Sequence, residues 1–311
     1  MGRYVVMRLL GLAGVLLAVS MITFALMHSV PGGPFDARIG DKALPDDIRL
    51  VLNRHYGLDR PLTEQYLVFL KNALRLDFGA SFIYVNRNVM EIYAERWPYT
   101  VQLAILTLIF GGSAGLALGI GAAIKKNTWV DYAATVITMF AIVVPSFVLA
   151  VMLQFIFAVK LGWLPTGGWD EPKQWILPVA CNAIVPIAVM QRFVRSSMVD
   201  AMNSNYVRTA RAKGVGETAV MLVHVLKNAL TPIITVGGPM IAGLLTGSFF
   251  VESMFRVPGV GALSVTAIQQ RDYTMIMATT LIWTTIIGVT YVLTDIAYAL
   301  ADPRITFVKD K

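Results

Sequence analysis

The sequence predicts an all-α, polytopic membrane protein with six transmembrane helices. Of its 311 residues, 56% are apolar and only 14% are charged, whereas soluble domains average about 45–50% and about 25%. A bilayer core about 30 Å thick requires roughly 20 apolar residues per helix, and six stretches reach that length. Because basic residues gather in alternate connecting segments, the sequence also predicts an orientation, with both termini in the cytoplasm.

The six predicted spans follow the longest apolar runs of the chain. The first comes after Arg3 and Arg8, but its run of about 22 residues exceeds the 7–15 of a signal-peptide core, so we expect it to be retained. The fourth is interrupted by Pro178, Asn182 and Pro186, and is kept because removing it would invert the side of the loop that follows. The predicted spans are Leu9–Val30, Pro98–Ile124, Tyr132–Val159, Trp175–Val194, Pro232–Val251 and Tyr273–Leu300.

The long segment between the first two spans is predicted to form a small helical extracytoplasmic domain. It covers residues 31–97, between the N-terminal segment with the first span (1–30) and a transmembrane core (98–311). Two helices are expected in it, starting at Pro45 and Pro61, because proline fits the first helical turn. The domain is either a solvated cap or a docking or lid surface for an extracytoplasmic partner.

The basic residues predict which side of the membrane each segment faces. With the N-terminus inside, 13 Lys and Arg residues lie in cytoplasmic segments and only four in the two short outer loops, which is a clear positive-inside pattern. The net charge of +7 therefore reflects topology and gives no reason to expect nucleic-acid binding. The inner residues are Arg3, Arg8, Lys125, Lys126, Arg192, Arg195, Arg208, Arg211, Lys213, Lys227, Arg304, Lys309 and Lys311. The outer ones are Lys160, Lys173, Arg256 and Arg271.

Ionisable side chains are scarce in the predicted spans, which argues against chemistry within the membrane. His28 lies at the outer end of the first span and Asp295 near the inner end of the last, where water or a partner can stabilise the charge. Cys181 is the only cysteine, so neither a disulfide nor a cysteine metal cluster is expected. We expect no catalytic, metal-binding or cofactor-binding residues. An ion-coupled secondary transporter is an alternative, and Asp295 would carry its coupling.

Small residues recur in the spans at helix-packing spacing. Gly111, Gly115 and Gly119 form two consecutive GxxxG units, and Gly243 and Gly247 form another. Glycine lets helix backbones approach closely, which matters in lipid because no hydrophobic force drives helices together. Prolines within the spans invite kinks that are either fixed bends or hinges of a gate. These prolines are Pro145, Pro178, Pro186 and Pro239.

The most informative segment is a polar loop between the fourth and fifth spans, at about residues 196–231. We expect an amphipathic helix over Asp200–Ala212, a sharp turn at Gly214 and Gly216, and a second helix from Glu217 to Leu230. Small residues would seat this helix–turn–helix in a groove of a cytoplasmic partner, and basic residues would meet the groove's acidic or polar rims. A plain amphipathic surface helix is the alternative. The residues that carry the prediction are Arg208, Thr209, Ala210, Arg211, Ala212, Lys213 and Gly214.

At RTARAKG (Arg208–Gly214) this loop resembles the coupling loop of ABC-importer permeases. Their E-A-A-x-x-x-G motif places its glycine at Gly214 and an alanine at Ala210, whereas Arg208 and Thr209 stand where the general motif has Glu and Ala. These departures are typical of the peptide and nickel import branch. Motifs along essentially the full chain resemble that branch, most of all the first (B-type) permease subunit of bacterial oligopeptide importers. They are PGGPFD (31–36), NTWVDY (127–132), VPSFV (144–148), GWLPTGG (162–168) and PGVGAL…RDY (258–273).

The resemblance implies a type I ABC-importer permease fold in the bacterial cytoplasmic (inner) membrane. It implies a homologous second permease subunit, two cytoplasmic ATPases that bind the coupling loops, an extracytoplasmic peptide-binding protein and surrounding membrane lipid, with no nucleic-acid partner. The chain has no G-x-x-x-x-G-K-[ST] motif, so it is not expected to be an enzyme. ATP and Mg would be bound by the partner ATPases, and this chain would need no cofactor of its own.

The implied function is ATP-driven import of oligopeptides by alternating access, with this chain forming half of the passage. Dipeptide, glutathione and nickel-chelate importers share the same motifs and remain alternatives, as does a membrane scaffold that transports nothing. The segment Met254–Leu263, which contains a Pro-Gly turn, is a candidate outer gate or docking element, with an ordinary re-entrant turn as its other interpretation. Its candidate residues are Phe255, Pro258, Gly259 and Gly261.

Overall fold

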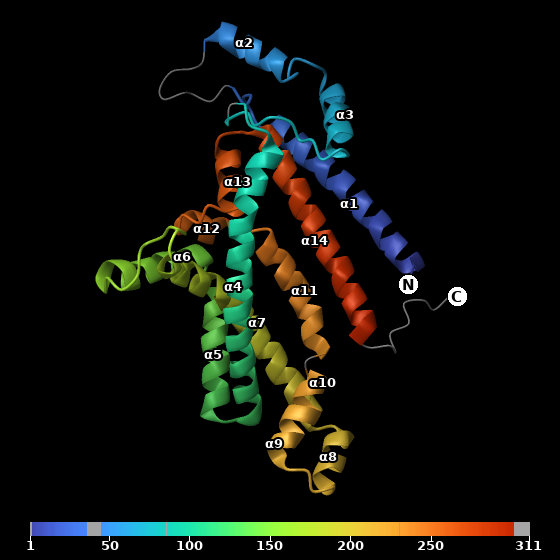
Figure 1. The fold of residues 1–311 in the computed structure, drawn as a ribbon, viewed down its shortest axis with the longest axis vertical. Helices are drawn as coiled ribbons and strands as arrows, with labels where there is room; N and C mark the ends of the chain where they lie inside the picture. Colours follow the sequence, from blue (N-terminus) through green and yellow to red (C-terminus); the bar gives the residue numbers. More distant parts are fainter. Residues whose placement is uncertain (1, 36–44, 85, 230, 302–311) are drawn as a thin grey trace. The chain divides into compact units, whose positions relative to one another are not determined.

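The computed structural model describes residues 2–35, 45–84, 86–229 and 231–301, and all of its named elements in these ranges are helices (Figure 1). The chain divides into two compact units. One comprises residues 1–99 with 258–288, and the other residues 100–257 with 289–311. Two long helices, α4 (Val89–Ile124) and α14 (Tyr273–Ala301), contribute to both units. The all-helical class predicted from the sequence is confirmed.

The first unit contains α1 and the small helices of the predicted outer domain. α2 and α3 begin at the residues directly after Pro45 and Pro61, where the sequence predicts helix starts. Asp36, the last residue of the PGGPFD motif, lies outside the described residues. The elements that belong wholly to this unit are α1 (Gly2–Ser29), α2 (Asp46–His55), α3 (Leu62–Ala73) and α13 (Val260–Gln269).

A buried carboxylate organises the first unit. Asp272 is fully buried and accepts hydrogen bonds from the Ser81 hydroxyl, the Phe82 amide (3.3 Å) and the Met275 amide (3.2 Å). It therefore caps the start of α14 and fixes the loop before α4 to that helix. An apolar cluster of Phe78, Val89, Ile92, Leu263, Ala267, Met275, Ala278 and Leu281 packs around this junction.

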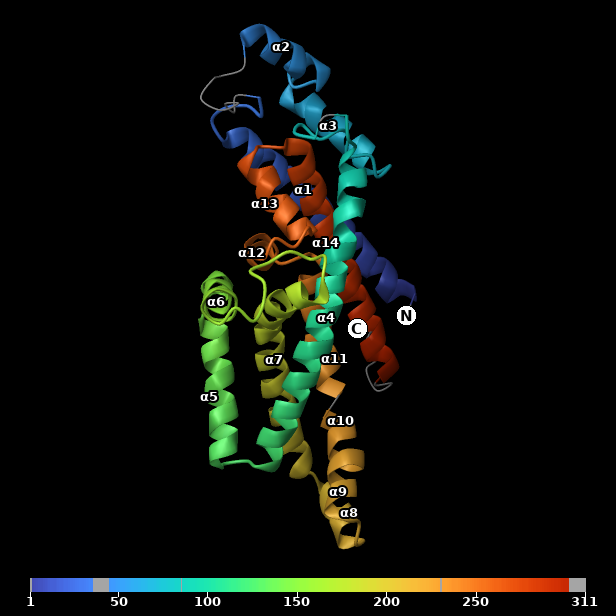
Figure 2. The ribbon, with the colours of Figure 1, turned by 60° about the vertical axis from the view of Figure 1, so that its left-hand side comes forward.

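The second unit holds the remaining long helices, and it departs from the predicted spans at one point above all. The third predicted span, Tyr132–Val159, is two segments bent by 105°, and Figure 2 shows the corner between them. Val144 is extended (ψ 121°) because the residue before a proline avoids the helical region, and here Pro145 follows. The segments are α5 (Trp129–Val143), α6 (Ser146–Leu153) and the π-helical η1 (Gln154–Lys160).

The other predicted spans differ from the structure mainly in length. α7 (Pro172–Met202) runs unbroken through Pro178 and Pro186, whereas α11 (Thr231–Leu245) ends early because Gly247 adopts φ +90°. A short α12 (Phe249–Met254) follows. Within the described residues, four helices are long and apolar enough to cross a membrane, or five if the bent pair is one span. The count of six and the cytoplasmic termini stay predictions.

Candidate functional site

The polar loop after α7 folds as a helix–turn–helix at one end of the second unit (Figure 1). The predicted helix Asp200–Ala212 is divided: α7 continues to Met202, Ser204 adopts extended geometry (φ −74°, ψ 155°), and a new helix follows. The loop elements are α8 (Asn205–Ala212), α9 (Glu217–Ala219), the π-helical η2 (Val220–Leu226) and α10 (Lys227–Ala229). Leu230, the predicted end of the second helix, lies outside the described residues.

The turn after α8 favours glycine at position 214. Gly214 adopts φ +79°, which costs an L-residue roughly 1–2 kcal/mol. Its amide donates to the carbonyl of Arg211 (3.0 Å), and the amide of Val215 donates to that of Ala210 (3.2 Å). This pair of bonds is a Schellman motif, which satisfies carbonyls at a helix C-terminus. The tight turn therefore favours glycine over most side chains at this position.

α8 has one buried face and one exposed face. Val207 and Ala210 are buried, and Ala210 is the residue that matches the family alanine. The other six residues of the predicted coupling sequence are all exposed: Arg208, Thr209, Arg211, Ala212, Lys213 and Gly214. The buried face anchors the loop to its own chain, and the exposed face is available to another molecule.

An apolar cluster, called here the loop cluster, joins the loop to two long helices. It comprises Ala123 of α4, Val194 and Met198 of α7, Val207 and Ala210 of α8, Val220 and Val225 of η2, and Ala229 of α10. Every member is buried. Because close-packed interiors deform little, a displacement of α8 would be passed directly to α4 and α7.

An ion pair closes the turn on its exposed side. Arg211 donates to Glu217 through Nη2 (2.6 Å to Oε1) and Nε (3.0 Å to Oε2). The Arg211 guanidinium lowers the pKa of Glu217, chiefly through this hydrogen bond. Arg211 is thus engaged within the loop, whereas the sequence analysis assigns it to a partner's rim. Arg208 and Lys213 are the remaining exposed cations of the coupling sequence.

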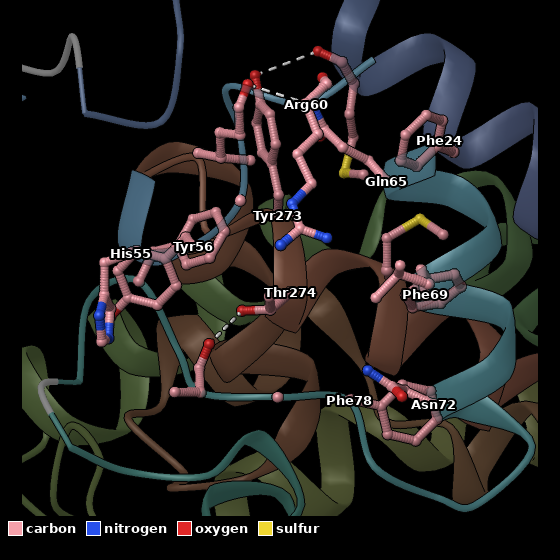
Figure 3. A pocket seen from close by; sticks show the side chains of 18 of the residues that line it. Phe24, His55, Tyr56, Arg60, Gln65, Phe69, Asn72, Phe78, Tyr273 and Thr274 are labelled. Atoms are coloured by element: carbon pink, nitrogen blue, oxygen red, sulfur yellow. Dashed lines mark hydrogen bonds between the residues drawn. The ribbon is translucent and has the colours of Figure 1, made fainter. Parts of the chain in front are cut away.

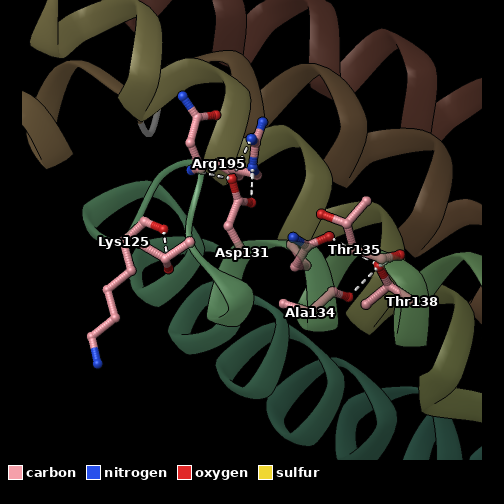
Figure 4. A network of polar contacts seen from close by, with 9 residues as sticks. Lys125, Asp131, Ala134, Thr135, Thr138 and Arg195 are labelled. Atoms are coloured by element: carbon pink, nitrogen blue, oxygen red, sulfur yellow. Dashed lines mark hydrogen bonds and ion pairs between the residues drawn. The ribbon is translucent and has the colours of Figure 1, made fainter.

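A second polar contact, which was not predicted from the sequence, joins α5 to α7. Asp131 at the start of α5 is 1% exposed, and it receives both Nε and Nη2 of Arg195 on α7, the latter at 2.6 Å (Figure 4). The Asn127 amide donates to the same carboxylate (2.9 Å). About one turn earlier on α7, Gln191 Oε1 accepts from Thr138 of α5 (3.1 Å). α5 and α7 are therefore held together by two polar contacts. The only sequence signal was the position of Asp131 within NTWVDY.

The first set of predicted packing glycines lies at a close helix contact. Gly111, Gly115 and Gly119 are buried. A Cβ on Gly115 would lie 2.7 Å from the Cβ of Met190, and one on Gly119 would lie 2.7 Å from that of Val194. The backbones of α4 and α7 therefore approach too closely for a side chain at these positions.

The second predicted glycine pair is not a helix contact in this structure. A Cβ on Gly243 would meet nothing within 4 Å. Gly247 lies beyond the end of α11 in a turn with φ +90°. Of the two glycines in this GxxxG unit, Gly243 lies at an open position on the helix and Gly247 lies in the turn that follows the helix.

The predicted gate residues are divided between the two units. Phe255 belongs to the second unit, where it is fully buried and its carbonyl accepts from the Gly168 amide (2.7 Å). Pro258, Gly259 and Gly261 belong to the first, where Gly259 caps α13 and Gly261 is buried within it. Phe255 therefore packs as a core residue and presents no exposed docking surface.

Long apolar helices and a projecting polar loop define a polytopic α-helical membrane protein. Sequence comparison assigns it further. Residues 115–307 match the binding-protein-dependent transport system inner membrane component family, and residues 1–104 match the N-terminal region of such membrane components. The chain belongs to this family, as its motifs predict, and is a multi-pass inner-membrane component of a transport system.

Full-length relatives are permease proteins. The dipeptide transport system permease protein DppB of Bacillus subtilis is 38% identical over 309 residues, covering 99% of both chains. The oligopeptide permease protein OppB of Haemophilus influenzae is 36% identical over 307 residues, covering 98% of this chain and 99% of the other. The glutathione permease protein GsiC of Escherichia coli is 39% identical over 305 residues, with the same coverage.

Solved structures share the fold of the core. The crystal structure of an amino acid ABC transporter with histidines matches with a TM-score of 0.55 at 15% identity, over 68% of this chain and 94% of that one. The inward-facing MetNI methionine ABC transporter gives the same TM-score at 12% identity, over 68% and 97%. At these identities the likeness concerns the fold alone.

Proposed function

We propose that this chain is a transmembrane permease subunit of an ATP-binding-cassette importer and forms half of a passage for oligopeptides. Full-length relatives named as dipeptide, oligopeptide and glutathione permeases support the substrate class. Dipeptide, glutathione and nickel-chelate import are the alternatives within it. The observation that carries the coupling role is the two-faced packing of α8. It buries Val207 and Ala210 against the chain's own helices and exposes the other six residues of the coupling sequence.

The proposed partners follow from the same role. A homologous second permease would complete the passage, two cytoplasmic ATPases would seat the exposed faces of the two coupling loops, and an extracytoplasmic binding protein would deliver peptide. ATP and Mg would be bound by the ATPases, and this chain would hold no cofactor. Arg208 and Lys213, which are exposed beside Gly214, would meet acidic or polar groups at the rim of the ATPase groove.

The mechanism we propose is alternating access driven from α8. Closure of the ATPase pair would push the two coupling loops together. The loop cluster would pass this displacement to α4 and α7, and the Asp131–Arg195 ion pair would pass it from α7 to α5. The helices would then move as one rigid group and open the passage toward the binding protein.

Substitution of Gly214 tests the coupling role. In Gly214→Asp we expect normal membrane insertion and no ATP-dependent peptide uptake, because the docking groove would bury an unpaired charge. The matched control is Gly214→Asn. Asparagine has nearly the same shape as aspartate and tolerates positive φ, but it carries no charge. Uptake of radiolabelled peptide into vesicles containing the reconstituted importer gives the measurement. Normal uptake by the aspartate variant would refute the coupling assignment. Equal loss of uptake in both variants would show that the shape of the new side chain, and not its charge, blocks coupling.

A further inference from the structure

The first unit contains a pocket that the coupling mechanism does not use. It encloses about 470 Å³ where the end of α1, the segments flanking α2 and α3, and the start of α14 meet (Figure 3). Ligand sites in proteins typically measure about 300–1,000 Å³. The pocket lies between the predicted outer domain and the outer ends of the first and last predicted spans, which contribute Phe24, His28 and Tyr273. It is called the aromatic pocket below.

Aromatic rings from separate elements form its walls. They include Phe24 of α1, Tyr56 after α2, Phe69 of α3 and Tyr273 of α14. His28 bridges two of them, with ring centroids 4.2 Å from Phe24 and 5.4 Å from Tyr273. Rings contributed by four elements provide apolar surface with little conformational freedom to lose.

Hydrogen bonds hold these walls in place without a ligand. Gln65 Nε2 donates to the carbonyls of Leu58 (3.2 Å) and Arg60 (2.8 Å), which fixes the α2–α3 connection. The Tyr273 hydroxyl donates to the Met27 carbonyl (3.3 Å), and Thr274 donates to that of Ala80 (2.9 Å). The start of α14 is itself capped by buried Asp272. The pocket is therefore preformed, which lowers the entropic cost of binding.

The charged side chains among the described lining residues are two arginines and one aspartate. Arg60 extends into it among the rings (Figure 3), and its Nη1 bonds Glu64 (2.9 Å). Arg54 also lines the pocket. Among the described lining residues Asp77 is the sole carboxylate, and its Oδ1 already accepts from the Gly79 amide (2.9 Å). Two guanidinium groups against one carboxylate in the lining favour an anionic group. Because a guanidinium has five N–H donors, Arg60 can keep its bond to Glu64 and still bind a second carboxylate.

We propose that the aromatic pocket binds the C-terminal residue of a short peptide. The Arg60 guanidinium holds the free carboxylate, and the rings of Phe24, Tyr56, Phe69 and Tyr273 enclose an apolar or aromatic side chain. This inference rests on the proposed peptide-import function and extends it, because it places a substrate-recognising site on the permease itself.

The test uses the full-length protein in lipid nanodiscs and two probes, the dipeptide Ala-Phe and its C-terminal amide. Calorimetric titration should show the acid binding about 10- to 100-fold more tightly than the amide, the range expected for charge-assisted hydrogen bonds. Arg60→Gln should reduce the affinity for the acid to that for the amide. The affinity of Arg60→Lys for the acid should lie between those of the wild type and Arg60→Gln, because lysine keeps the positive charge but cannot form two parallel hydrogen bonds to a carboxylate.

Two further variants isolate the pocket. Arg49→Gln is the matched control, because Arg49 also pairs with a carboxylate on its own helix (Asp46, 2.9 Å) but does not line the pocket; it should bind both probes like the wild type. Val68→Trp, which enlarges an α3 side chain lining the pocket, should weaken both probes while Arg60 remains.

Three results would overturn the proposal: no binding of Ala-Phe, equal affinity for acid and amide, or no effect of Arg60→Gln. Loss of binding-protein capture in Arg60→Gln without any peptide binding would instead identify a protein-docking surface, and it too would overturn the proposal. ATP-driven uptake is measured separately. If uptake is intact but the acid and the amide bind equally, only the pocket proposal is refuted. If the acid binds more tightly than the amide but there is no ATP-driven uptake, only the proposed importer function is refuted.

Discussion

At the scale of single residues, some members of the coupling sequence determine the local geometry of the loop, and others form its exposed surface. Gly214 is favoured by the turn, Ala210 by the buried face, and Arg211 by its pair with Glu217. The sequence predicted the glycine turn because positive φ has a strong residue preference. It could not predict the Arg211–Glu217 pair, because residues six positions apart across a turn meet only once the turn geometry is known.

The Arg211–Glu217 pair predicts the titration of the Glu217 carboxyl. Its folded pKa lies below the ordinary 4.5 because of the hydrogen bond from Arg211. The pair therefore contributes stability that is fully present above about pH 4.5 and is lost as the pH falls through the lower folded pKa. NMR of ¹³C-labelled glutamate should show this depressed value, and Arg211→Gln should return it toward 4.5. An unchanged titration in that variant would mean that the pair does not form in solution.

At the scale of helices, α4 and α7 are locked by two kinds of contact: the glycine stripe that brings their backbones together, and the loop cluster at their ends. The stripe was predictable from its four-residue period. The partner helix was not, because small-xxx-small spacing gives no information about which helix approaches. The Gly243–Gly247 spacing is identical, yet it makes no comparable contact in this structure.

Two glycines of α4 should respond in opposite directions to the same substitution. In Gly115→Ala the new methyl group would meet Met190 and Ile187 at under 3 Å, so we expect a loss of about 1–3 kcal/mol from overpacking. In Gly112→Ala nothing lies within 4 Å, so higher helix propensity should leave stability unchanged or raise it by up to about 1 kcal/mol. Thermal unfolding in detergent compares them. Equal midpoints would show that α4 and α7 do not pack at this distance.

The Asp131–Arg195 pair should also respond asymmetrically. Asp131 is 2% exposed at its side chain and Arg195 is 30% exposed. Arg195→Met leaves a buried carboxylate uncompensated, which costs about 3–5 kcal/mol, whereas Asp131→Asn leaves a cation that can reach water. We therefore expect Arg195→Met to lower the unfolding midpoint more. If coupling depends on the pair, Asp131→Asn should reduce peptide transported per ATP hydrolysed in the reconstituted importer. An unchanged ratio would mean that the ion pair stabilises the fold but has no part in coupling.

At the scale of the whole molecule, the sequence predicted the class because hydropathy and charge asymmetry act over tens of residues. It placed the start of α14 correctly at Tyr273 and the starts of α2 and α3 at their prolines. It missed the 105° corner at Val144–Pro145 because a proline alone does not distinguish a kink from a break. It missed Asp131–Arg195 because those residues are 64 positions apart, and a single sequence carries no information about such pairs.

Assembly can be tested on the protein from its native membrane. We expect purification in mild detergent to recover this chain with a second permease and two ATPase subunits, identified by mass spectrometry. Gly214→Asp should lose the ATPases and keep the second permease, because only the loop would contact the ATPases. Recovery of the chain alone, under conditions that preserve known importers, would favour a secondary transporter, and Asp295→Asn would then be expected to abolish uptake.

The two faces of α8 also bear on how such a protein can diverge. Val207 and Ala210 are constrained by their buried neighbours, whereas Tyr206, Arg208 and Thr209 are exposed. The outer residues can therefore drift with the ATPase that they face while the inner ones stay fixed. Exchanging only these outer residues between two permeases should redirect each to the other's ATPase. The exposed face of one helix would then determine which permease pairs with which ATPase within one cell.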